Sequence, residues 1–139
     1  MKFVGIDLHK NHLVVAVEDE NGPVGKPKRL WCRQQESIVK FFQGLGPFRA
    51  VIEASCSYRW LYGVLAPMGG VVLAHPYRLR AIVSARAKTD KLDAKLLAKL
   101  LHIDMIPRAY VPPQAYQELR DVTRTRARLA RAATQAKNQ

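Results

Sequence analysis

The sequence predicts a mixed α/β fold: a five-stranded sheet with flanking helices and a long basic helix at the C-terminal end. Three strand patterns come first in the chain, and strand and helix patterns alternate after them. With 139 residues, 48% hydrophobic and 24% charged, the chain has the composition of an ordinary globular domain. This composition excludes collagen-like, low-complexity and fully disordered proteins.

The first half of the chain opens with the three strand patterns. Met1–His9 and Asn11–Glu18 carry apolar residues at strand spacing around a tight turn. Asp19–Gly25 has the residue types of turns, and Lys28–Cys32 fits a third strand. Strands joined by short turns pair antiparallel, so these three are expected to form a meander.

Strands and helices alternate in the rest of the chain. Arg49–Glu53 and Val71–His75 are short apolar strands, and right-handed crossovers favour parallel pairing with the first strand. Three antiparallel strands plus two parallel ones fit a ribonuclease H-like sheet better than a plain doubly wound one. The predicted helices are Gln35–Gly44, Ser57–Ala66, Pro76–Ala85, Asp90–Leu101 and Gln114–Lys137.

Charge is the most informative part of the composition. The 23 Lys and Arg residues against 11 Asp and Glu residues give +12, and 14 of these bases lie in residues 76–139. Such a field favours phosphate polymers as partners, although an anionic membrane surface or simple solubility would also account for it. No apolar run approaches the ~20 residues of a membrane span, so we expect a soluble protein that stays inside the cell.

Two acids end strands that we expect to pair in parallel. Asp7 lies among apolar residues of the first strand, and Glu53 ends the strand that begins at Arg49. A carboxylate in such a place costs free energy unless a charged group meets it, and two close acids favour a cation between them. The alternative is that each strand-end acid simply faces water.

The helix pattern that begins at Asp90 carries a second acid, Asp93, on its leucine-rich side. Carboxylates converging from two strands and a helix suit Mg²⁺ or Mn²⁺, and such ions assist phosphoryl transfer. The alternative is that Asp90 caps the helix and Asp93 stabilises its positive end, worth about 1 kcal/mol. A separate solvent face, which could follow phosphates, carries Lys91, Lys95 and Lys99.

Further bases lie on both sides of this helix. Those before it could hold a scissile strand or be plain surface charge, and they are Arg78, Arg80, Arg86 and Lys88. In the last helix an apolar seam containing Leu119, Val122 and Leu129 lies opposite arginines that face either phosphates or solvent. These arginines include Arg120, Arg124 and Arg128.

The histidines show no ligand spacing, so we expect structural or surface roles for them. His75 is the one to watch, because it ends a strand at the edge where the acids are expected. The aromatic residues, Trp31 and Tyr77 among them, are expected to be core or half-buried packing residues rather than platforms for bases, because no alternation of basic and aromatic residues accompanies them.

Three motifs resemble the N-terminal domain of the DEDD transposases, and the third is the most specific. They are Gly5-Ile6-Asp7-Leu8-His9-Lys10, Val51-Ile52-Glu53-Ala54-Ser55 and Lys88-Thr89-Asp90-Lys91-Leu92-Asp93-Ala94. The resemblance implies the Holliday-junction-resolvase (RuvC-like) branch of the ribonuclease H-like fold. It also implies that an acidic tetrad binds Mg²⁺, with Mn²⁺ as a substitute, and cleaves and exchanges DNA strands. The tetrad residues would be Asp7, Glu53, Asp90 and Asp93.

The same resemblance implies partners and a wider architecture. Members of this insertion-sequence family are related to pilin-gene invertases, act on element ends and target DNA, and many use a structured bridge RNA. Residues 1–112 would be the catalytic domain, and 113–139 a basic helix leading to an absent C-terminal domain with a serine nucleophile. The chain is then expected to be part of a longer bacterial protein, oligomeric and nucleoid-associated in the cytoplasm, and not fully active alone.

Two other classes of protein remain. A sugar-kinase-like ATPase also carries Gly-Ile-Asp in its first strand, but it needs small residues where Leu8, His9 and Lys10 stand. A non-catalytic module that binds DNA or bridge RNA and dimerises through the last helix is the second. Replacing the acids separates these readings, because only catalysis predicts loss of metal binding without loss of fold.

Overall fold

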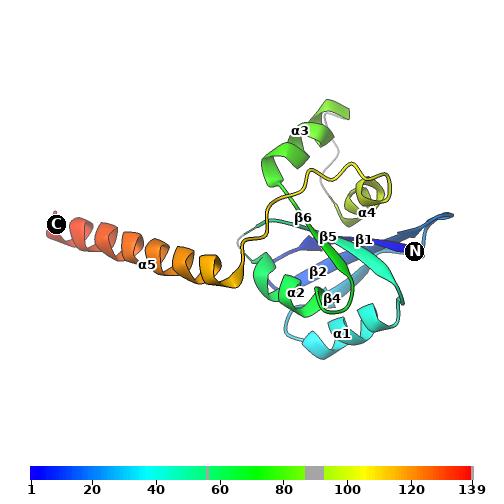
Figure 1. The fold of residues 1–139 in the computed structure, drawn as a ribbon, viewed down its shortest axis with the longest axis horizontal. Helices are drawn as coiled ribbons and strands as arrows, with labels where there is room; N and C mark the ends of the chain where they lie inside the picture. Colours follow the sequence, from blue (N-terminus) through cyan, green and yellow to red (C-terminus); the bar gives the residue numbers. More distant parts are fainter. Residues whose placement is uncertain (56, 87–92, 139) are drawn as a thin grey trace. The chain divides into compact units, whose positions relative to one another are not determined.

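A computed structural model describes residues 1–55, 57–86 and 93–138 of the chain (Figure 1). Its contacts divide the chain into two units, Met1–Ala109 and Tyr110–Gln139. The first unit holds the sheet, and the second holds a single long helix. Among the helices of the described ranges, none combines the length and the apolar character needed to cross a lipid bilayer.

Six strands form one mixed sheet in the described ranges: β1 (Lys2–Leu8), β2 (His12–Asp19), β3 (Gly22–Pro23), β4 (Lys28–Trp31), β5 (Phe48–Glu53) and β6 (Gly70–Ala74). The central strand β1 pairs antiparallel with β2 and parallel with β5, and β6 continues the parallel half. β3 and β4 both pair with β2. The mixed sheet is compatible with the predicted ribonuclease H-like fold.

The predicted count of five strands is one short. Gly22–Pro23 pairs with the end of β2, inside a segment that has the composition of a turn. The turn itself forms as predicted, since the Asn21 amide donates to Asp19 Oδ1 at 2.8 Å and Gly22 has a φ of 111°. Two residues are too few to show strand alternation, which is why the pattern missed β3.

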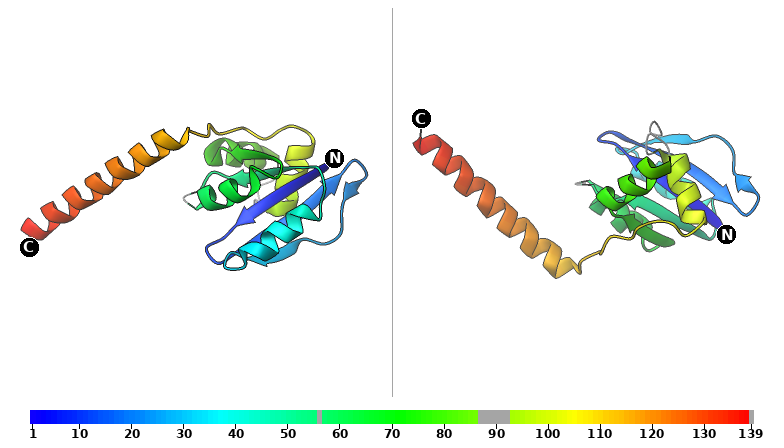
Figure 2. Two further views of the ribbon diagram at one scale, coloured as in Figure 1. Left: turned by 60° about the horizontal axis from the view of Figure 1, so that its bottom comes forward. Right: turned by 90° about the horizontal axis from the view of Figure 1, so that it is seen from above.

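The helices of the described ranges follow the prediction closely in four of five cases: α1 (Gln35–Gln43), α2 (Tyr58–Leu65), α3 (Pro76–Arg86), α4 (Ala94–His102) and α5 (Gln114–Lys137). Helices α1 and α2 cover one face of the sheet, and α3 and α4 cover the other (Figures 1 and 2). On the second face, Val51 of β5 is buried in one cluster with Leu79 of α3 and Leu97 of α4.

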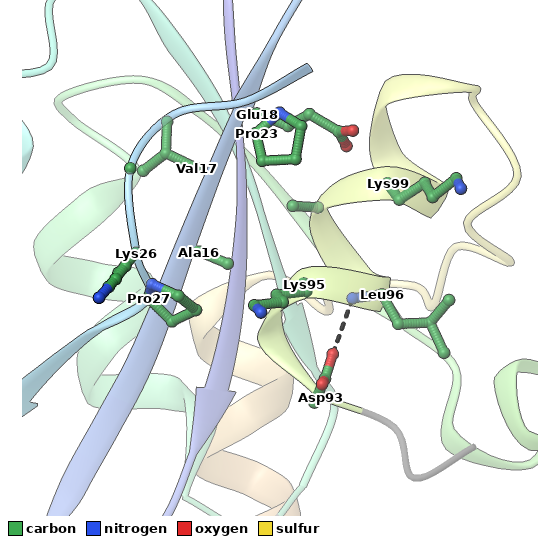
Figure 3. A pocket seen from close by; sticks show the side chains of 12 residues that line it. Ala16, Val17, Glu18, Pro23, Lys26, Pro27, Asp93, Lys95, Leu96 and Lys99 are labelled. Atoms are coloured by element: carbon green, nitrogen blue, oxygen red, sulfur yellow. Dashed lines mark hydrogen bonds between the residues drawn. The ribbon is translucent and has the colours of Figure 1, made fainter. Parts of the chain in front are cut away.

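Helix α4 is the fifth case, because it begins later than predicted. Its first residue is Ala94, and Asp93 is the N-cap, with an extended backbone and Oδ1 accepting from the Leu96 amide at 2.8 Å (Figure 3). The prediction that Asp93 lies on the leucine side of this helix is therefore wrong, and its side chain is exposed. The leucine stripe itself is confirmed, with Leu97 and Leu101 buried.

Helix α4 lies directly on the backbone of β1. A side-chain carbon at Gly5 would collide with the Ala94 carbonyl oxygen and the Ala98 amide nitrogen, and would lie 2.9 Å from Leu97 Cβ. Only glycine therefore permits this approach. At the other end of the contact, the rings of Phe3 and His102 stack with centroids 4.5 Å apart.

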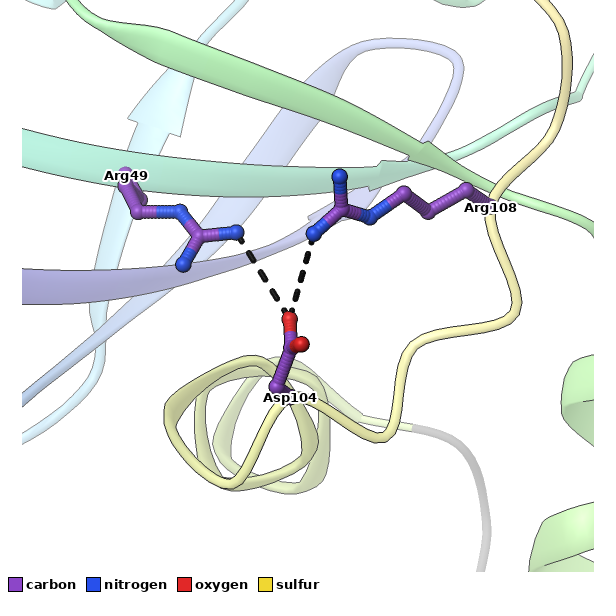
Figure 4. Close-up of polar contacts among 3 residues, drawn as sticks. All are labelled: Arg49, Asp104 and Arg108. Atoms are coloured by element: carbon purple, nitrogen blue, oxygen red, sulfur yellow. Dashed lines mark hydrogen bonds and ion pairs between the residues drawn. The ribbon is translucent and has the colours of Figure 1, made fainter.

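The C-terminal end of α4 is fastened by Asp104. This residue has a φ of 52°, and the Met105 amide donates to the Leu100 carbonyl at 2.8 Å, which closes the helix. Its Oδ1 lies 3.7 Å from Arg49 Nη2 and 3.2 Å from Arg108 Nη2 (Figure 4). These pairs are exposed, so each stabilises by less than about 1 kcal/mol, but together they join β5, α4 and the following loop.

Helix α5 forms the second unit with the boundaries that the sequence predicts. None of its residues is buried, and the apolar seam is exposed, with 60% of Leu119 and 66% of Leu129 accessible to solvent. The Gln117 side chain donates to the Pro112 carbonyl at 2.7 Å, which ties the first turn to the residues before it.

We expect Gly5→Ala to lower the free energy of unfolding by about 3 kcal/mol, because the new methyl group must push α4 away from β1. The measurement is urea denaturation followed by circular dichroism. Gly63→Ala is the matched control, since nothing lies near that position in α2 and alanine favours helix by up to about 1 kcal/mol. Equal stability of the Gly5→Ala variant and the unaltered chain would contradict this account.

Candidate active site

The carboxyl ends of β1, β5 and β6 meet at one edge of the sheet. Ile6 pairs with Ile52 in the parallel register of β1 and β5, so Asp7 and Glu53 come next on neighbouring strands. Glu53 pairs in turn with Ala74 at the end of β6, which His75 follows. The edge therefore collects both strand-end acids and His75, as the sequence predicts.

The two acids also share a face of the sheet. Gly5 and Val51 face α4, and side chains two residues further along a strand point the same way. Asp7 and Glu53 are therefore on the face that carries α4. This placement puts both carboxylates on one side of the sheet.

Helix α4 runs antiparallel to β1 and directs its N-terminus toward this edge. Its last residue, His102, stacks on Phe3, whereas its first residues lie over Gly5, nearer to Asp7. The capping residue Asp93 therefore lies at the same end of the domain as the strand-end acids. The helix N-terminus adds a partial positive charge there, which favours carboxylates and other anions.

Asp7 contacts His9, a histidine whose place in the sequence shows no ligand spacing. Its Oδ2 lies 3.0 Å from His9 Nε2, and the His9 ring stacks on His12 with centroids 4.6 Å apart. His12 meets Trp31 edge-on at 5.9 Å. The tight turn after β1 and the pairing of His12 with Trp31 bring this cluster together, which counting along the sequence cannot reveal.

Burial lowers the pKa of His12 below its ordinary value of 6.5. The positive charges of Arg29 and His9 lower it further, and Asp7 opposes them. The lowered pKa favours the neutral ring of His12, which lies beside the pair of His9 and Asp7.

A second aromatic pair lies on the other side of the acids. His75 and Tyr77 have ring centroids 6.2 Å apart, and His75 Nδ1 is buried without a hydrogen-bond partner among the described residues. Tyr77 is 79% exposed, so the expectation that it is a core or half-buried residue is wrong. Its place in the first turn of α3, just beyond β6, leaves it outside the sheet layers.

The described residues do not contain a complete metal site. Within residues 1–55, 57–86 and 93–138, no three His, Cys, Asp or Glu side chains are grouped so that they could hold an ion. Asp90, the remaining member of the predicted tetrad, lies outside these ranges. Asp7 and Glu53 nevertheless offer paired hard oxygen donors of the kind that Mg²⁺ prefers.

The predicted nucleic-acid-binding residues are spread over three helices. Arg78 and Arg80 are exposed on α3 close to the acidic edge, and Arg86 is the last residue of that helix. Lys88 and Lys91 lie outside the described residues. The other exposed bases are Lys95 and Lys99 on α4, and Arg120, Arg124 and Arg128 on α5 in the second unit.

Sequence comparison places this domain among known proteins. The family model of the IS110-type DEDD transposases, described as transposase, matches residues 4–139. The chain is 28% identical over 134 residues to y4qE of Sinorhizobium fredii, which is named as a candidate transposase. That match covers 89% of this chain and 33% of the relative, so the chain spans about a third of the relative's length.

We expect acid to destabilise the fold through His12. Because its pKa is lowered in the folded chain, the unfolded chain binds more protons as the pH falls through about 6.5, and stability is lost there. Urea denaturation at about pH 7.5 and about pH 5.5 should show a larger loss in the unaltered chain than in His12→Asn. An equal loss in both proteins would rule out His12 as a cause.

Proposed function

Because the chain belongs to the IS110-type DEDD transposase family, we propose that it carries the metal-dependent catalytic part of a DNA transposase. The catalytic domain spans residues 1–112, and residues 113–139 form a basic helix that leads to the rest of the transposase. The activity is cleavage and exchange of DNA strands during insertion-sequence transposition. Complete strand exchange would require the whole transposase, because this chain spans only about a third of the length of the relative it matches.

One observation carries the proposal: Asp7, the next-to-last residue of β1, and Glu53, the last residue of β5, directly follow the paired residues Ile6 and Ile52 and lie on one face of the sheet. Two carboxylates held side by side repel each other unless a cation lies between them. The donor chemistry suits Mg²⁺, with Mn²⁺ as a substitute, rather than zinc. The proposed catalytic and metal-binding residues are Asp7, Glu53, Asp90 and Asp93.

The residues of the chain itself prepare the substrate. A divalent ion, when bound, would polarise the phosphodiester and stabilise the leaving oxygen. The exposed guanidinium groups of Arg78 and Arg80 lie at the start of α3, where they can hold phosphate oxygens near the acids. His9 fixes the orientation of Asp7 through the 3.0 Å contact with Oδ2.

The proposed partners follow from the charge and the family. Element ends and target DNA would lie on the basic surfaces of α3 and α4, and the arginines of α5 would contact DNA or a structured bridge RNA. The relation to pilin-gene invertases, assembly as a dimer or higher oligomer, and a place with the nucleoid in the bacterial cytoplasm complete this proposal.

A non-catalytic module that binds nucleic acid and dimerises is the second candidate function. One observation favours it: the apolar seam of α5 is exposed, and such a seam can join two copies of a helix. Both candidates predict nucleic-acid binding. Only the catalytic candidate predicts a divalent ion at the acidic edge, so metal binding decides between them.

We expect saturable Mn²⁺ binding that Asp7→Asn and Glu53→Gln each weaken about tenfold or more, because each removes an oxygen donor. The measurement is calorimetric titration of the folded chain, with and without a short branched DNA. Circular dichroism should show that both variants keep their helices and strands.

Glu36→Gln is the control for this titration, because Glu36 is an exposed acid on α1, away from the acidic edge. It should bind Mn²⁺ like the unaltered chain. Absence of binding even with DNA present would overturn the catalytic proposal, and so would equal binding by all four proteins. Either result would favour the binding module.

A further inference from the structure

A groove of about 690 Å³ lies between α4 and the segment that connects β2 with β4 (Figure 3). Its floor is made of the small residues Ala16 and Ala98, which are 6% and 2% exposed. Pro23 and Pro27 line the side opposite α4. The floor and this side are therefore apolar and rigid, and the groove is wide enough for sugars or bases to lie in it.

Lysines border the groove on both sides. Lys95 and Lys99 belong to α4, and because they are four residues apart they lie about 6 Å from each other along the helix axis. Lys26 belongs to the opposite side, and Figure 3 shows it across the groove from the helix. All three side chains are exposed, so their amines are available to phosphates.

Two acidic side chains, those of Asp93 and Glu18, line the groove. Asp93 lines it at the N-terminus of α4, the end of the helix that points toward the strand-end acids. Glu18 lines it too, with a side chain only 13% exposed and Oε2 buried without a hydrogen bond among the described residues. His102 Nδ1 is 3.9 Å from that oxygen, which is beyond hydrogen-bond distance. A hydroxyl or amino group of a ligand would satisfy this oxygen.

We propose that this groove seats one extended strand of nucleic acid and leads it along α4 toward Asp93 and the acidic edge. Phosphates lie on the amines of Lys26, Lys95 and Lys99, and sugars or bases lie on the apolar floor. The volume is in the range of sites for small ligands, which favours a single strand over a duplex. The inference rests on the proposed function in one respect, namely that the bound nucleic-acid strand continues from the groove to Asp7 and Glu53.

Acetylation of lysine amines, read by mass spectrometry, tests the groove residue by residue. The 139-residue chain is treated with and without a single-stranded DNA of about twelve nucleotides, and with the RNA of the same sequence. Bound strand should slow acetylation at least several-fold at Lys26, Lys95 and Lys99, and leave Lys40 on α1 unchanged. Protection by RNA alone would show that the groove requires a 2′-hydroxyl, whereas equal protection assigns the groove to the shared phosphate backbone. Unchanged acetylation of the three lysines would overturn the proposal.

Charge removal gives a second, independent readout. Replacing Lys26, Lys95 and Lys99 together by glutamine should reduce the slope of log affinity against log salt by about 2 for a single strand. The control replaces Lys2, Lys40 and Lys137 by glutamine, which removes the same charge elsewhere. An equal loss of slope in both triple variants would show that only net charge matters, and the groove would be refuted.

The two proposals fail separately. The lysine variant keeps Asp7 and Glu53, so its Mn²⁺ titration should match that of the unaltered chain. Lost metal binding with intact protection of the lysines would overturn the catalytic function and leave the groove. Intact metal binding without protection of the lysines would overturn the groove and leave the catalytic function.

Discussion

The contact between the backbone of α4 and that of β1 at Gly5 is the constraint on which the rest of the first unit depends. Without a side chain on Gly5, the helix approaches until Ala94 and Ala98 meet the strand. This closeness fixes how far the N-terminus of α4 lies from the end of β1, and therefore fixes Asp93 relative to Asp7. Packing and the candidate active site are thus set by the same contact.

The acidic edge combines electrostatic cost with nearby compensation. Asp7 and Glu53 lie near the carboxyl ends of adjacent parallel strands, where like charges repel, but Asp7 also contacts His9 and the N-terminus of α4 lies at the same edge. Compensation of this kind is partial, because the groups involved are half exposed or carry only partial charge.

Most of the fold and the pairing of the strand-end acids could be predicted from the sequence, because apolar periodicity and parallel register are local rules. The start of α4 could not, since Asp90 and Asp93 are both good capping residues and only tertiary contacts decide between them. The cluster around His9 and the exposure of Tyr77 also escaped prediction. The cluster depends on which strands become neighbours, the exposure of Tyr77 depends on where α3 begins, and the groove beside α4 depends on the path of a loop.

Two short strands, β3 and β4, pair with the side of β2 that faces away from β1, and this arrangement has a consequence for aggregation. β3 covers one end of that edge, where Pro23 offers no amide hydrogen, and β4 covers the other. On the opposite side of the sheet, Ala74 of β6 bridges to Arg108. Neither edge presents a long open row of hydrogen-bonding groups within the described residues, so another chain cannot easily extend the sheet. The short strands at both sides of the sheet thereby disfavour association of copies of the chain through their strands.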